Sequence, residues 1–66
     1  MRGCAVCSRA LASERLEAAF RYDRDPLYVC APLCAEEWEA RQHLVALALG
    51  GQVGNPVVRW TLVREG

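Results

Sequence analysis

Four cysteines constrain what this 66-residue chain can fold into more than any other feature. Cys4 and Cys7 are separated by two residues, and Cys30 and Cys34 by three. Paired thiols at such a spacing can chelate an ion from a tight turn, and two pairs complete a tetrahedron around Zn²⁺. The 22-residue gap between the pairs is modestly longer than in most paired-cysteine zinc sites. The pattern predicts one structural zinc site, with Cys4, Cys7, Cys30 and Cys34 as its ligands.

Three other uses of these cysteines compete with zinc. Two disulfides would require an oxidising compartment, but no basic and apolar leader is visible, so we expect a cytoplasmic protein with reduced thiols. Redox catalysis by the Cys4–Cys7 motif would require a preceding strand in a βαβ unit, which the pattern does not offer. An iron ion in the same four-thiolate site remains chemically open.

The length of the chain allows one domain with a small core. A chain of this size buries only about 60% of the surface that its unfolded form exposes. A structural zinc ion contributes roughly 10–16 kcal/mol of apparent binding energy, as much as the ~5–15 kcal/mol that usually separates folded from unfolded proteins. We therefore expect the metal-free chain to be largely unfolded.

The charge balance does not favour nucleic acid as a partner. Eight arginines offset eight acidic residues, and lysine is absent. Four thiolates add −4 and a zinc ion adds +2, which takes the formal charge from 0 to −2. Nucleic-acid binding depends on a net basic surface, so this balance argues against it. No stretch approaches the ~18 apolar residues of a membrane span, so no membrane role is expected.

Period-two alternation predicts a β-hairpin between the two cysteine pairs. Residues 16–22 alternate apolar and polar side chains, residues 23–26 form the turn, and residues 27–29 return as a second strand. The preceding segment, residues 13–16, is consistent with either a helix start or a loop. The hairpin would return Cys30 to the first cysteine pair.

A helix is predicted from Pro32 to Leu49 and is expected to end at Gly50 and Gly51. Cys34 falls in its first turn, where the positive end of the helix dipole would stabilise a negative metal centre. The residues expected on one common face are Cys34, Trp38, Val45 and Leu49.

A third strand is predicted at residues 57–63, after a linker at residues 50–56. Val58, Trp60 and Leu62 would form its apolar face. We divide the chain into a zinc module at residues 1–49 and a linker with a C-terminal strand at residues 50–66. That strand would pack either on the same domain or on a dimer partner. The second half of the helix, residues 44–49, is apolar all round, so we expect a homodimer that covers both.

The order of these elements resembles a treble-clef zinc finger. Within that fold, the stretch Leu27–Trp38 is similar to the TRASH/YHS/MYM group, and the resemblance covers about residues 3 to 42. The positions that match the group's cysteines and aromatic residues are Cys4, Cys7, Tyr28, Cys30, Cys34 and Trp38. Ala31 departs from the serine that often follows the third cysteine, which weakens the helix cap. The resemblance implies zinc or heavy-metal binding and a role as an interaction module, a nucleic-acid-associated finger or a metal sensor.

The function expected from these features is a structural zinc-binding module for protein interaction or self-association. A closed four-thiolate site offers no position for a substrate, so we expect no enzymatic activity. A nucleic-acid-binding zinc finger and a heavy-metal sensor or carrier are the alternatives. His43 is expected to be a surface residue and Trp38 to pack over the zinc turn. Tyr22 and Tyr28 are expected to pack in the hairpin rather than to stack on bases.

Overall fold

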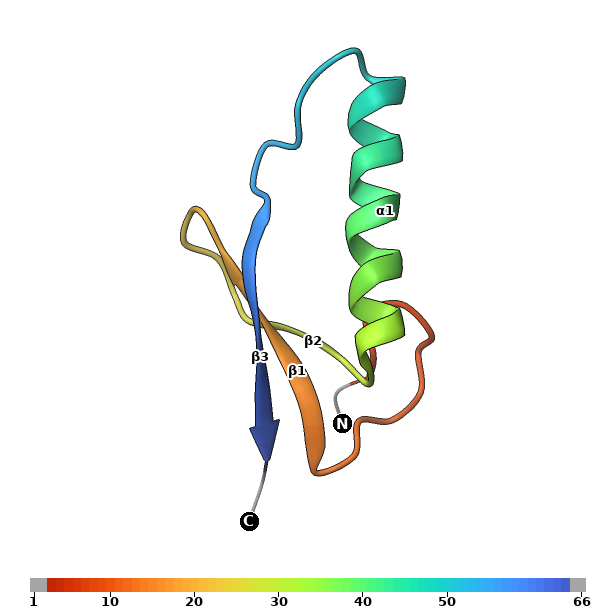
Figure 1. Cartoon of the computed structure of the whole chain (residues 1–66), viewed down its shortest axis with the longest axis vertical. Coiled ribbons are helices and arrows are strands. Elements are labelled where there is room, and N and C mark those ends of the chain that lie inside the picture. The colour runs from red at the N-terminus through yellow and green to blue at the C-terminus, as the bar shows by residue number, and fades with distance from the viewer. Residues whose placement is uncertain (1–2, 65–66) are drawn as a thin grey trace.

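A computed structural model describes residues 3–64, which form a three-stranded antiparallel sheet and one helix (Figure 1). The elements are β1 (Glu14–Phe20), β2 (Leu27–Val29), α1 (Pro32–Ala48) and β3 (Val57–Arg64). β1 is the central strand, with β2 on one side and β3 on the other. The expected small α+β fold is therefore present. Residues 1, 2, 65 and 66, the ends of the two predicted segments, lie outside the described residues.

The pairing of the C-terminal strand, which the sequence left open, is within the chain. β3 runs antiparallel to β1 over the whole length of β1, from Glu14 opposite Arg64 to Phe20 opposite Val57. The side chains of Glu14 and Arg64 also form an ion pair at 3.0 Å. This pairing starts β1 two residues before the predicted position, because the ladder with β3 outweighs any local helical preference at residues 13–16. Tyr22, which the alternation included, lies beyond the strand.

A register shift between Ala19 and Phe20 changes which β3 residues face the helix. Ala18 pairs with Trp60, whereas Phe20 pairs with Val57 and not with Val58. Directly paired residues share one face of a sheet, so the irregularity brings Val57 onto the inner face. Val58 is 63% exposed. The prediction that Val58 belongs to the apolar face of β3 was therefore wrong.

The helix boundaries agree with the prediction to within one residue. Ala31 is the N-cap and makes no side-chain capping bond, as its lack of a hydroxyl implies. At the other end, Gly50 adopts φ 72°, the left-handed conformation that glycine accepts without strain. The N–H groups of Gly50 and Gly51 donate to the carbonyls of Leu47 and Ala46 at 3.1 and 3.0 Å. These two bonds form the Schellman motif that ends the helix.

The inward face of α1 differs from the predicted one in its second half. Ala35 and Ala46 are buried, and Trp38 and Gln42 are half-buried between them. These four positions recur every three or four residues and so lie on one side of the helix. The predicted face members Val45 and Leu49 are instead 53% and 80% exposed. Residues 44–49 are all apolar, so the sequence of this segment did not reveal which of its side chains face the sheet.

The core is small and lies where the first turn of α1 meets the sheet. Val29 is completely buried and clusters with Cys4 and Ala35. The half-buried side chains packed against this cluster are Val6, Leu11, Leu16, Leu27, Cys30, Cys34 and Trp60. The Cα radius of gyration is 12.3 Å and the extents are 42 × 22 × 19 Å, whereas a compact chain of this length has a radius of about 10.8 Å. The molecule is therefore elongated, with the second half of α1 extending past the core (Figure 1).

The linker between α1 and β3 is attached to the hairpin turn by hydrogen bonds. The Asn55 side chain accepts from the Tyr22 N–H at 2.8 Å and donates to the Tyr22 carbonyl at 3.2 Å. The Arg21 N–H donates to the Pro56 carbonyl at 3.0 Å. These bonds fix the point at which β3 begins. Within residues 3–64, no helix is long and apolar enough to cross a membrane.

Candidate metal centre

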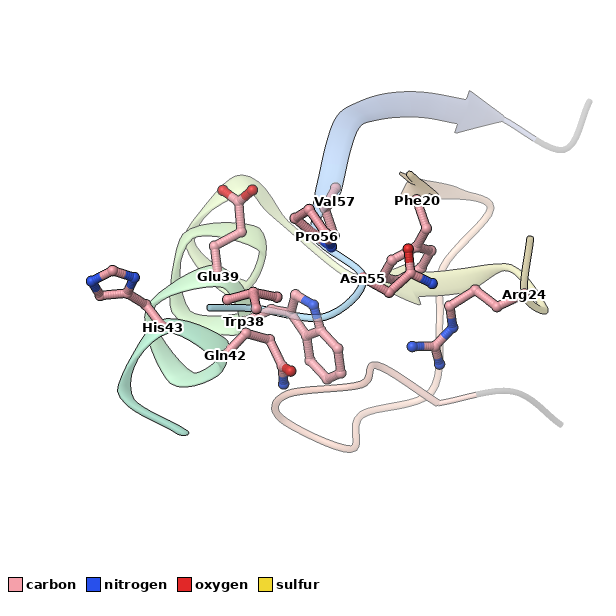
Figure 2. A pocket seen from close by; sticks show the side chains of 10 residues that line it. Phe20, Arg24, Trp38, Glu39, Gln42, His43, Asn55, Pro56 and Val57 are labelled. Carbon is pink, nitrogen blue, oxygen red and sulfur yellow. The ribbon is translucent and has the colours of Figure 1, made fainter. Parts of the chain in front are cut away.

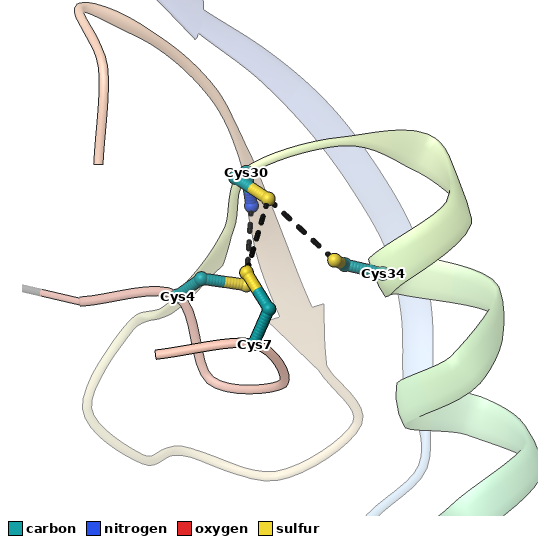
Figure 3. Close-up of side chains that lie close together, drawn as sticks. All are labelled: Cys4, Cys7, Cys30 and Cys34. Atoms are coloured by element: carbon teal, nitrogen blue, oxygen red, sulfur yellow. Dashed lines mark hydrogen bonds between the residues drawn. The ribbon is translucent and has the colours of Figure 1, made fainter. Parts of the chain in front are cut away.

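The four cysteines lie together at one end of α1 (Figure 3). Cys4 and Cys7 belong to the N-terminal turn, Cys30 follows the last residue of β2, and Cys34 lies in the first turn of α1. All four Sγ atoms lie within 4.8 Å of one another. The structure thus brings together the four residues that the spacing singled out.

The N-terminal turn is held in shape by backbone hydrogen bonds. Cys4 N–H donates to the Arg9 carbonyl at 2.8 Å, and Ser8 N–H donates to the Cys4 carbonyl at 3.1 Å. Ser8 has φ 65°, which lets the chain reverse direction immediately after Cys7. Ala5 N–H donates to the Tyr28 carbonyl at 3.0 Å and so ties the turn to β2. The sequence gave no specific signal for the left-handed residue, since serine is not among the types that favour this conformation.

The distances between the sulfur atoms fit a tetrahedral ion. With Zn–S bonds of about 2.3 Å, the edge of a regular tetrahedron is about 3.8 Å. Cys30 Sγ lies 3.5 Å from both Cys7 Sγ and Cys34 Sγ, and no pair in the group is wider than 4.8 Å. Small side-chain rotations are enough to equalise these distances. The group can therefore hold one metal ion with all four thiolates.

Backbone donors prepare Cys4 to be a thiolate. Its Sγ accepts hydrogen bonds from Val6 N–H at 3.5 Å and Cys30 N–H at 3.4 Å. Burial of the Cys4 thiol raises its pKa, but backbone hydrogen bonds from Cys7, Val6 and Cys30 outweigh it and lower the pKa to about 6. Such bonds to sulfur are typical of the groups around a metal ligand, which fix its orientation and share its charge.

The other thiols show why a cation suits this group. Hydrogen bonding to Cys34 lowers the pKa of Cys30, but contact with Cys7, burial and the charge on Cys4 reverse the effect and raise it. Hydrogen bonding to Cys30, burial and the nearby Cys4 raise the pKa of Cys34 to about 12. One thiolate therefore opposes ionisation of its neighbours. A divalent cation at the centre would offset this repulsion and let all four thiols ionise.

The helix contributes to the same electrostatics. Cys34 is the third residue of α1, and its N–H already bonds to the Ala31 carbonyl at 3.0 Å. No acidic side chain lies in the first turn. The positive end of the helix dipole is thus directed at the thiol group, where it favours negative charge.

Exposure differs among the four sulfur-bearing residues. Cys4 is 4% exposed, Cys30 and Cys34 are intermediate, and Cys7 is exposed. One edge of the candidate site is therefore open to solvent at Cys7, while the opposite edge is closed by the core.

Trp38 does not pack over the N-terminal turn that carries Cys4 and Cys7, contrary to the sequence-based expectation. It lines a cleft of about 140 Å³ beside the middle of the helix, together with Phe20 and Val57 (Figure 2). Trp60 is the tryptophan that packs against the cluster containing Cys4. His43 stands at the edge of the cleft and is exposed, as expected, and it lies outside the thiol group. β3 brings Trp60 to the cysteine cluster, and its pairing with β1 joins segments too far apart in the sequence for local spacing to reveal.

Arginine side chains cover the aromatic rings of the hairpin. The Arg15 guanidinium lies 5.1 Å from the centroid of Tyr28, and that of Arg21 lies 5.6 Å from Tyr22. Tyr28 is half-buried in β2, as expected, whereas Tyr22 is 57% exposed beyond the end of β1. The expectation that Tyr22 packs within the hairpin was therefore wrong.

None of the protein-family models matches this chain, and neither does any curated protein or solved structure. What the chain does must therefore be argued from the thiol group and the surfaces around it.

Proposed function

We propose that the chain is a treble-clef-like zinc-binding module, similar to the TRASH/YHS/MYM group, that serves protein interaction and has no catalytic role. The convergence of four Sγ atoms within 4.8 Å carries this proposal. Cys4, Cys7, Cys30 and Cys34 would hold one Zn²⁺. The metal would supply folding energy by joining the N-terminal turn, the end of the hairpin and the start of α1.

The chemistry of the donor set favours zinc and a structural role. Four thiolates in tetrahedral positions are preferred by zinc, and iron is the other metal that such a site accepts. Four protein ligands leave no coordination position for water or substrate. Without such a position the metal has no water to activate and no carbonyl to polarise.

Metal analysis of the purified protein tests this proposal. Elemental analysis combined with native mass spectrometry should give one zinc per chain. Serine in place of any of the four cysteines should lose the ion and most tertiary structure, because the binding energy is also folding energy. An absorption band of iron–thiolate charge transfer would identify iron instead. A single-cysteine variant that keeps both metal and fold would contradict the four-ligand site.

The exposure of Cys7 supports a second candidate function, that of a metal carrier or sensor. An exposed ligand leaves the metal ion accessible on that side, so an incoming chelator could bind the metal as the Cys7 thiolate leaves it, which is the first step of ligand exchange. A carrier should release zinc to a competing chelator within seconds to minutes, whereas a structural site should retain it for hours. Measuring the exchange half-time with the folded protein separates the two functions.

No surface observation adds weight to the nucleic-acid alternative. The rings that would stack on bases are covered on one face by arginines of the same chain. The formal charge of the chain is 0 before metal binding. Retention on nucleic acid that falls with added salt would revive this alternative.

A further inference from the structure

The solvent-facing side of α1 carries a row of apolar side chains that the other described residues, 3–64, leave uncovered. We call this row, Leu33, Ala40, Leu44 and Leu47, the outer stripe. Leu33, Leu44 and Leu47 are 77%, 65% and 63% exposed, and Ala40 is exposed as well. At about 100° per residue these four positions fall within a sector of about 60° on the helix surface.

The outer stripe lies opposite the face that packs on the sheet. The inward positions, Ala35, Trp38, Gln42 and Ala46, point about 165° away from it. No other described element can therefore reach the stripe without leaving the sheet. The remaining exposed large apolar side chains of residues 3–64 do not extend this row and lie elsewhere, at Tyr22, Val45, Leu49, Val58 and Leu62.

The spacing of the stripe is that of a helix–helix contact. Its members are separated by seven, four and three residues. Packed helices use a repeat of alternating three and four residues, 3.5 on average, and Glu37 occupies the one position of this repeat that is not apolar. Leu33 precedes Ala40 by seven residues, and Leu47 follows it by seven. Leu33 and Leu47 are thus equidistant from Ala40, whose small side chain lets two helices approach closely, whereas the position that mirrors Leu44 is occupied by Glu36.

We propose that the outer stripe is the interface of a homodimer, in which α1 of one copy packs antiparallel to α1 of the other across a two-fold axis at Ala40. Leu33 of each copy then packs on Leu47 of the other. A two-fold interface uses the same surface on both copies and closes the assembly at two. This inference deepens the proposed interaction role by naming the surface and the partner, a second copy of this chain.

Charge selects the antiparallel arrangement. The acidic side chains Glu36, Glu37 and Glu39 lie in the first half of α1, and Arg41 lies in its second half. Antiparallel packing about Ala40 places Arg41 of each copy level with Glu39 of the other and within one helical turn of its Glu37. Parallel packing would bring the two acidic halves together, and like charges side by side are unfavourable. The Glu37–Arg41 ion pair at 3.2 Å within one chain is exposed and can exchange with its counterpart across the axis.

Sedimentation of the zinc-loaded protein between about 1 and 300 µM tests the proposal, because that range brackets a small interface. The native chain should shift from monomer to dimer across this range. Leu47→Arg should weaken dimerisation by about 100-fold, because a two-fold interface contains every substitution twice and a charge is costly to bury. Val45→Arg is the matched control: it adds the same charge on the same helix, at a position 53% exposed and about 130° away from the stripe. It should leave the dimer intact.

Mixing two complementary variants tests the orientation. Leu33→Glu and Leu47→Arg should each be monomeric alone at about 50 µM. Mixed together they should form a heterodimer in native mass spectra, since antiparallel packing puts the new acid opposite the new base and leaves a native Leu33–Leu47 contact on the other side. Parallel packing offers no such pairing and would give no heterodimer.

Three results would overturn the proposal. They are a native chain that stays monomeric at every concentration, equal loss of dimer in the Leu47→Arg and Val45→Arg proteins, and a mixture that yields no heterodimer. Zinc content measured on the same samples keeps the two proposals separate. A monomer with one zinc per chain contradicts the dimer alone, whereas a dimer without zinc contradicts the zinc module alone.

Discussion

Replacing Cys4 with serine should unfold the domain rather than merely weaken metal binding. Cys4 is the most buried of the four cysteines, and its Sγ accepts hydrogen bonds from Val6 and Cys30. It also belongs to the cluster with Val29 and Ala35. Losing this sulfur would therefore remove one of the four proposed metal ligands and disturb the cluster in which the turn, the sheet and the helix meet.

The expected loss of stability follows from comparing the free energy of metal binding with the free energy that the buried core residues contribute. Val29 is the one fully buried large side chain in the described residues, and Ala18, Ala35 and Ala46 are the other buried residues besides the cysteine. Burying one valine contributes about 1.5–3 kcal/mol and each alanine methyl about 0.8 kcal/mol, so these four residues supply about 4–5 kcal/mol. The net stability of a chain of this length is about 3–10 kcal/mol. A structural zinc ion contributes about 10–16 kcal/mol, which exceeds both, so the zinc-free chain should be unfolded.

Circular dichroism and amide NMR spectra at 25 °C measure this outcome. The Cys4→Ser protein should show little helix signal and narrow amide dispersion, with or without added zinc. Chelating zinc from the native chain should give the same spectra and should be reversed when zinc is restored. Ala12→Ser, which adds the same hydroxyl at an exposed position, should match the native spectra. A chelated native protein with dispersed amides and a cooperative thermal transition would refute the reasoning, because the core alone would then suffice.

Three further outcomes are expected. Asn55→Ala should destabilise the zinc-loaded protein by about 1–2 kcal/mol in thermal unfolding, because it removes both hydrogen bonds to the Tyr22 backbone. Gln52→Ala, at an exposed position of the same linker, should leave the stability nearly unchanged. Gly50→Ala should lower the free energy of unfolding by about 1–2 kcal/mol, because Gly50 has φ 72°. Gly51 has no positive φ and there is free space where its Cβ would be, so Gly51→Ala should lower it by less than half as much, as measured by chemical denaturation. Zinc affinity should fall steeply as the pH drops from about 7.5 to 5, because protons compete for the thiolates; competition titrations that show pH-independent affinity would contradict ligation by thiolates.

The elements whose ends are marked by proline, glycine or cysteine were predictable from the sequence. Pro32 and the Gly50–Gly51 pair delimit α1 to within one residue, because proline is pre-organised for a first helical position and glycine accepts the left-handed turn. The spacing of the cysteine pairs likewise predicted the thiol group, because cysteines this close in the sequence are typical of metal sites and disulfides. In each case a single residue type has one dominant structural use.

The features that depend on long-range pairing were not predictable. The register shift beside Ala19 moves Val58 outward, and no residue type in β3 signals it. Glu14 joins β1 only because Arg64 lies opposite, far along the chain. Local alternation describes which residues share a face but carries no information about where a ladder is interrupted. The packing of Trp60 against the cysteine cluster was missed for the same reason, since it depends on how β3 pairs with β1.

The small core and the uncovered helix surface have a common origin in the thiol group. Metal-free domains of this length must bury most of their apolar residues around one centre, because burial is their main source of stability. Here the four clustered cysteines bring together the N-terminal turn, the end of β2 and the first turn of α1 at one end of the molecule. The second half of α1 borders the cleft that Gln42 and His43 line together with Val53, Asn55 and Pro56 of the linker. A helix fixed in this way at one end can present Leu44 and Leu47 to solvent without loss of the fold. The stripe is therefore free to be a binding surface, which a domain stabilised by its core alone would have had to bury.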